Sequence, residues 1–96
     1  MDRNQILTII RNEKPYLQKH FGLLSIGLFG SFARDEQHPE SDIDLLVELS
    51  NPSFDSLAGL QIYLEKSLGH PVELIRKRKG MRTSFLKRIE RDLHHA

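Results

Sequence analysis

The chain contains no cysteine and no tryptophan, and aromatic residues make up only 7% of its 96 residues. Without cysteine there can be no disulfide framework and no thiolate metal site. The five histidines do not fall at the spacing of zinc ligands, which argues against a zinc site as well. Any metal bound by this chain is therefore expected to have oxygen ligands.

Long apolar runs are also absent, and none approaches the length of a membrane-spanning helix. Charged residues are mixed with apolar ones from Met1 to Arg11, unlike in a signal peptide. There is no internal repeat, linker or low-complexity segment. We therefore expect one domain covering residues 1–96, because the length allows a single core and little more. Without a signal peptide or a membrane-spanning run, we expect this domain in the cytoplasm.

Hydrophobic periodicity predicts alternating helices and strands. A first helix is expected to begin near Asp2 or Asn4, to bend or restart at Pro15, and to end at Phe21-Gly22. The further elements are expected at 24–29 (strand), 31–35 (short helix), 42–49 (strand), 53–68 (helix), 72–75 (strand) and 82–94 (helix). This pattern is typical of an α/β domain, although strand order and direction do not follow from it.

A Gly-Ser turn, Gly30-Ser31, directly follows the predicted strand at 24–29 and opens the short helix. Glycine allows backbone N–H groups to approach an anion closely, and a helix N-terminus adds unpaired donors. The Ser31 hydroxyl is one more donor. This turn therefore predicts a phosphate site. Arg34, one turn further on, could pair either with phosphate or with nearby acids.

Paired carboxylates begin the next predicted strand, in the sequence Asp42-Ile43-Asp44. Alternate side chains of a strand share a face, so Asp42 and Asp44 should point the same way, about 7 Å apart along the chain. Two such carboxylates at the edge of an apolar core repel each other and require a counter-charge. Oxygen ligands of this kind favour magnesium or manganese, with phosphates completing the coordination. The segment therefore indicates a nucleoside triphosphate and a divalent metal.

Gly30-Ser31, followed after ten residues by Asp42-x-Asp44, resembles the signature of the DNA polymerase β-like nucleotidyltransferase superfamily. A chain this short resembles more narrowly a minimal nucleotidyltransferase (MNT), the antitoxin half of HEPN-MNT toxin–antitoxin pairs, over nearly its whole length. The resemblance implies a small mixed β-sheet flanked by helices. It also implies ATP as donor substrate and two Mg²⁺ ions.

The superfamily usually carries a third carboxylate on a later strand, and Glu73 is the matching residue here. The usual residue is Asp, so the longer Glu73 side chain departs from the pattern. The resemblance implies that Asp42, Asp44 and Glu73 are catalytic and bind the metal, while Gly30, Ser31 and Arg34 bind the nucleotide. The alternative is that Glu73 is a solvent-facing residue on an edge strand.

The charge of the chain is divided unevenly although the total is only +1. Residues 1–69 hold six basic and ten acidic side chains, whereas residues 70–96 hold eight and three. The basic residues of the second part begin with the run Arg76-Lys77-Arg78-Lys79. They could contact triphosphate, an acidic partner or RNA, or simply form a solvated surface. RNA is the weaker interpretation, because no aromatic side chains are interleaved with the charges.

Nothing in the sequence resembles a pocket for an antibiotic, a tRNA end or a primer. The resemblance implies that the acceptor is a tyrosine on a cognate HEPN ribonuclease toxin, silenced by AMP transferred from ATP. Two alternatives remain open. One is an antitoxin of this fold that neutralises the toxin by binding alone, and the other is a nucleotidyltransferase subunit that acts on a small molecule or RNA.

Overall fold

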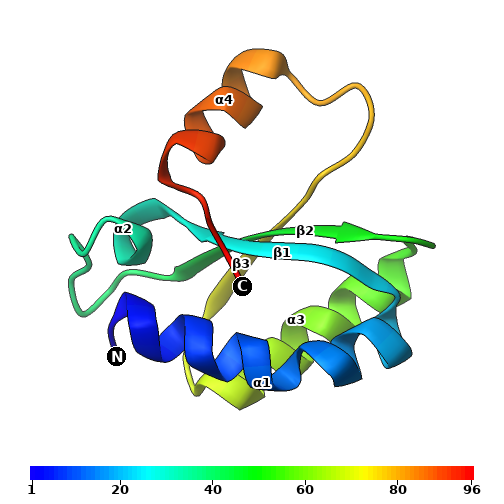
Figure 1. Cartoon of the computed structure of the whole chain (residues 1–96), viewed down its shortest axis with the longest axis horizontal. Helices are drawn as coiled ribbons and strands as arrows, with labels where there is room; N and C mark the ends of the chain where they lie inside the picture. The colour runs from blue at the N-terminus through cyan, green and yellow to red at the C-terminus, as the bar shows by residue number, and fades with distance from the viewer.

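A computed structural model describes residues 1–96 as a four-stranded mixed sheet with the strand order β3-β2-β1-β4 (Figure 1). Strand β1 is antiparallel to both of its neighbours, β2 and β4, while β2 and β3 are parallel. The elements in chain order are α1 (Arg3–Phe21), β1 (Leu23–Phe29), α2 (Gly30–Ala33), β2 (Ile43–Leu49), α3 (Phe54–Leu68), β3 (Val72–Arg76), α4 (Thr83–Asp92) and β4 (His94–His95). The expected mixed sheet with flanking helices is confirmed.

The two faces of the sheet are covered differently. Helices α1 and α3 lie together against one face, and α4 lies on the opposite side (Figure 1). The main core fills the space between the sheet and the helix pair α1/α3. None of the helices combines the length and apolar character needed to cross a membrane.

Strand β2 shows how the sequence divides between these faces. Ile43, Leu45 and Val47 are fully buried in the main core, while Asp44 and Glu48, which alternate with them, are half-buried on the other face. The period of two that predicts this strand therefore also directs its acids away from the α1/α3 core. The side chains of Asp44 and Glu48 lie on the α4 side of the sheet.

Helix ends follow from local chemistry. Asp2 caps α1 through its side chain, which accepts a hydrogen bond from the backbone N–H of Gln5, and Gly22 ends the helix in the left-handed region. Asp2 is thus the cap, and Asn4 is not. The expected restart at Pro15 was wrong, because α1 is continuous through this exposed residue. Packing of one face of α1 against the core outweighs the hydrogen bond that proline removes.

The C-terminal end also differs from expectation. Helix α4 ends at Asp92 rather than at residue 94, and His94–His95 form the short strand β4 beside Gly27 and Leu28 of β1. The Ala96 N–H donates to the Ile26 carbonyl and extends this pairing. The chain leaves the helix at Leu93, whose backbone is extended. Pairing with an open edge of β1 therefore replaces the last helical turn.

Gly27 allows this close approach, because a Cβ atom at this position would lie 2.5 Å from Leu93 Cδ1. We predict that Gly27→Ala lowers the free energy of unfolding by about 1–3 kcal/mol, since the added methyl group would displace Leu93 and the start of β4 from β1. Chemical denaturation measures the change. Adding Leu93→Ala should make the Gly27→Ala substitution nearly neutral, and an unchanged penalty in the Leu93→Ala background would contradict the packing argument.

Candidate active site

Three chain segments meet at one end of the sheet. Strand β1 is antiparallel to β2, so its last residue, Phe29, lies opposite Asp44 near the start of β2. Strand β3 is parallel to β2, so Glu73 near its start lies beside Asp44 on the other side. Paired residues on neighbouring strands project to the same face at close range. The register thus brings the Gly30-Ser31 turn, Asp44 and Glu73 together.

The Asp44 carboxylate lies directly against the backbone of Gly30. A Cβ atom on Gly30 would overlap the Asp44 carboxyl group, and the Gly30 φ of +77° falls in the left-handed region that side chains disfavour. Two independent constraints therefore require glycine at the turn. They also make this turn and the Asp44 carboxylate one structural unit.

Burial and neighbouring acids raise the pKa of Asp44 to about 6. Desolvation of the half-buried carboxyl is the largest cause, followed by hydrogen bonding with Glu73 and by the negative charges of Glu73 and Asp42. The positive charge of Arg34 acts in the opposite direction. Near neutral pH this site therefore gathers negative charge that a cation would stabilise.

Asp42 lies just before β2 and is exposed. Its negative charge raises the pKa of Asp44, whereas Glu73 acts on Asp44 through both charge and hydrogen bonding. No three His, Cys, Asp or Glu side chains are already gathered as a metal-binding group. The structure thus brings Asp44 and Glu73 together, with Glu73 exposed on the edge strand β3 and Asp42 exposed just before β2. Ser41, which is buried, accepts a hydrogen bond from the His38 backbone N–H and shapes the loop before Asp42.

The Gly30-Ser31 turn opens the four-residue helix α2, as expected, although the helix begins at Gly30 and ends at Ala33. Phe29 is its N-cap and supplies no side-chain acceptor to the first turn. Because the first N–H groups of a helix have no partner within the helix, they remain available to an anion. Ser31 is half-buried at this opening.

Arg34 is held by a residue that sequence analysis missed. Its Nη1 atom donates to Asp92 Oδ2 on α4 at 2.7 Å, and its Nε lies 3.5 Å from Glu36 Oε2. The pairing of Arg34 with nearby acids is present in the structure, and its pairing with phosphate stays a prediction. Asp92 stands 58 residues away in the chain, and no sequence pattern links the two. The contact ties α4 to the helix that follows the Gly30-Ser31 turn.

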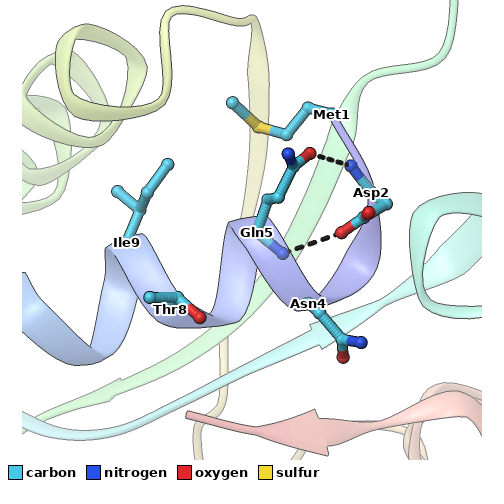
Figure 2. Close-up of a pocket in the computed structure, with 6 residues that line it drawn as sticks. All are labelled: Met1, Asp2, Asn4, Gln5, Thr8 and Ile9. Atoms are coloured by element: carbon cyan, nitrogen blue, oxygen red, sulfur yellow. Dashed lines mark hydrogen bonds between the residues drawn. The ribbon is translucent and has the colours of Figure 1, made fainter.

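A shallow hollow of about 620 Å³ lies elsewhere, over the first turns of α1 (Figure 2). Asp2 is its only ionisable side chain, and Figure 2 shows this carboxylate and the Gln5 side chain occupied in the reciprocal capping hydrogen bonds. The hollow does not gather several ionisable side chains for acid–base or metal chemistry. The chemistry-bearing residues are those around Asp44.

The basic residues of the C-terminal part are not engaged in ion pairs. The only salt bridges in the structure involve Arg3 and Arg34, so the run Arg76-Lys77-Arg78-Lys79 and the basic residues of α4 lie more than 4 Å from any carboxylate. Residues 77–79 are exposed. Their charge is therefore free to act on something outside the chain.

Comparison with known proteins decides the family. Residues 10–94 match the family model described as "Nucleotidyltransferase domain". The chain belongs to the nucleotidyltransferase domain family. A relative from Methanocaldococcus jannaschii, provisionally named as a protein adenylyltransferase, is 44% identical over 93 residues, covering 94% of this chain and 93% of the relative.

Two solved structures show the same nucleotidyltransferase fold. One, provisionally named as a minimal nucleotidyltransferase, has a TM-score of 0.75 and 27% identity, covering 98% of this chain and 95% of its own. Another is a toxin–antitoxin structure with AMP-PNP, with a TM-score of 0.69 and 25% identity, covering 99% of this chain and 72% of its own. The expected polymerase β-like class is thereby confirmed, and the chain is an enzyme of the nucleotidyltransferase type.

We predict that Gly30→Ala lowers the free energy of unfolding by about 1–3 kcal/mol and abolishes nucleotidyl transfer, because the new methyl group strains the backbone and displaces the Asp44 carboxylate. Thermal denaturation and a transfer assay measure the two effects. Gly80→Ala is the matched control: its φ is +82°, but nothing lies within 4 Å of the added methyl group. Equal effects of the two substitutions would contradict a role for the contact with Asp44.

The raised pKa of Asp44 predicts a pH-dependent stability. A carboxyl whose pKa is about 6 in the folded state and near 4 in the unfolded state binds more protons when folded, so stability falls as pH rises from 4 to 6. Asp44→Asn removes this loss. In magnesium-free buffer, its stability relative to the unsubstituted chain should rise by about 1 kcal/mol across that range, a value reduced by solvent screening. A difference that stays constant from pH 4 to 7 would contradict the shift.

Proposed function

We propose that this nucleotidyltransferase transfers AMP from ATP to a tyrosine hydroxyl of a cognate HEPN ribonuclease toxin and thereby neutralises it. The observation that carries the proposal is the convergence of the Gly30-Ser31 turn with Asp44 and Glu73 at one end of the sheet. Support for the kind of substrate comes from the relative named for protein adenylyltransfer and from the toxin–antitoxin structure with AMP-PNP.

The donor groups fit a divalent cation. Asp44 and Glu73 present only carboxylate oxygens, and their mutual repulsion together with burial already favours a bound proton on Asp44. A hard divalent cation would neutralise the same two carboxylates in place of the proton, because such cations prefer oxygen ligands. We propose that Asp42 and Asp44 hold one Mg²⁺ and that Glu73 contributes to a second. Bound there, the metal supplies neutralisation of the triphosphate and a lowered pKa for the acceptor hydroxyl.

The remaining residues position the nucleotide. The N–H groups at the start of α2 and the Ser31 hydroxyl would bind the β- and γ-phosphates, which turns the α-phosphorus toward the acceptor. Pyrophosphate then leaves on the side opposite to the attacking hydroxyl. Arg34 is exposed at the end of α2 and shares its five N–H donors between Asp92 and an incoming phosphate.

The 96 residues form one sheet with its helices around Asp44 and Glu73, so we propose that the acceptor contributes its own binding surface. A protein substrate satisfies this requirement better than a small molecule, since a folded partner can dock over an open site. This argument favours a toxin as acceptor. The unpaired basic residues 76–79 give such a partner a charged surface to meet.

The test is to incubate the chain with ATP, magnesium and a candidate cognate HEPN toxin. We predict a mass increase of one or more AMP units on the toxin, located at a tyrosine by peptide mapping. The double substitution Asp42→Asn/Asp44→Asn should abolish transfer and toxin neutralisation. A control of equal charge change, Asp2→Asn/Glu90→Gln, alters two exposed acids that the proposal does not use and should keep both activities, since asparagine also caps a helix.

Two outcomes would overturn the proposal in different ways. Full neutralisation by Asp42→Asn/Asp44→Asn, with no AMP on the toxin, would show an antitoxin that acts by binding alone. Transfer of label from ATP to a small molecule or RNA, with the toxin unmodified, would identify a different acceptor.

A further inference from the structure

One edge of the sheet is open along most of its length. Strand β3 pairs with β2 only, so its other side is the edge. The ladder to β2 uses the odd-numbered residues of this segment: the Ile43 N–H donates to the Pro71 carbonyl, and the Lys77 N–H donates to the Val47 carbonyl. Because backbone groups alternate in direction along a strand, those of residues 72, 74 and 76 point away from β2.

The first of these outward residues is capped within the chain. The Val72 N–H donates to Glu65 Oε2, and the Val72 carbonyl accepts from Gln61 Nε2, both at 3.0 Å. No side chain caps Leu74 or Arg76 in the same way. Two consecutive outward-facing backbone positions of β3 therefore keep hydrogen-bonding capacity for a further strand.

An apolar groove runs beside these two positions. It has a volume of about 320 Å³ and is lined by Phe54, Leu57, Ala58, Gln61, Leu74 and Arg76. Phe54 is 85% exposed, the highest value among the large apolar side chains of the chain. An aromatic side chain so exposed next to an open strand edge is typical of a surface that a partner covers.

The positive charge beside the groove indicates that the partner segment carries an acidic residue. Arg76 ends the groove, and the exposed residues Lys77, Arg78 and Lys79 continue from it without any carboxylate within 4 Å. A second copy of this chain would bring the same positive charges. A segment with a carboxylate beside Arg76 would instead form a charge-assisted hydrogen bond there.

We propose that the free edge of β3 is the docking site for an extended segment of the protein substrate, with backbone hydrogen bonds to Leu74 and Arg76. Apolar side chains of that segment fill the groove beside Phe54, and an acidic residue meets Arg76. The inference rests on the proposed function for the identity of the partner. Docking at this edge anchors the acceptor protein next to the strand that carries Glu73.

Amide hydrogen exchange tests the backbone contacts. In the chain alone, the N–H groups of Leu74 and Arg76 should exchange quickly, while that of Val72 is protected by Glu65. In complex with the cognate HEPN toxin, exchange at residues 74 and 76 should slow by at least about tenfold. A complex that leaves both amides unprotected overturns the proposal, and so does a mixture in which no complex forms. Concentration-dependent protection in the chain alone overturns it in favour of self-association.

Substitutions test the groove and the edge separately. Phe54→Ser empties the groove, and Arg76→Pro removes an outward N–H without touching the ladder to β2. Each should weaken toxin binding by about tenfold or more, with Arg76→Gln weakening it less because the N–H remains. The matched control is Leu24→Ser, an apolar residue of β1 that is 56% exposed and distant from β3 in the strand order. A control as damaging as Phe54→Ser would overturn the proposal.

The readouts separate this inference from the proposed function. Edge variants should raise the KM for toxin and leave kcat for AMP transfer nearly unchanged at saturating toxin. Asp42→Asn/Asp44→Asn should instead abolish kcat and keep toxin binding. If the variants at the β3 edge bind and modify the toxin normally, the docking proposal is wrong, while the proposed AMP transfer still stands.

Discussion

The contact between the Asp44 carboxylate and the Gly30 backbone is the constraint on which the site depends. It exists because β1 ends where β2 begins, so the turn that could receive phosphate and the acid that could bind metal are packed against each other. Glu73 joins them from β3 because that strand runs parallel to β2. A parallel and an antiparallel neighbour are both needed to bring these three groups to one end of the sheet.

The cost of this arrangement is electrostatic, and the remainder of the fold offsets it. Desolvation and repulsion raise the pKa of Asp44, which means that the folded chain holds unfavourable negative charge near neutral pH. The apolar alternate residues of β2 offset this by burial in the α1/α3 core. On the other face, Leu93 packs over Gly27 directly after α4, and Asp92 at the end of α4 holds Arg34. Contacts on both faces of the sheet therefore offset the unfavourable electrostatic energy of the site.

Local patterns predicted most elements, and long-range contacts account for what they missed. The alternation in β2, the Gly30-Ser31 turn and the glycine stops at residues 22 and 69 are all visible within a few neighbouring residues. The two-residue strand β4 has no period, and its partner lies in β1. The ion pair between Arg34 and Asp92 is equally non-local. The restart expected at Pro15 does not occur, because packing of the buried face of α1 keeps the helix continuous. The nearness of Asp44 and Glu73 required the family resemblance, since sequence pattern does not reveal strand direction.

The alternation at the start of β2 serves both folding and chemistry, because neighbouring residues point to opposite faces of the sheet. Ile43 points into the core and Asp44 points to the opposite face, because successive side chains of a strand alternate in direction. A slip of one residue against β1 would turn the acid into the apolar interior and expose the isoleucine in its place. A one-residue insertion or deletion at the start of this strand should therefore disrupt both the core packing and the position of the Asp44 carboxylate.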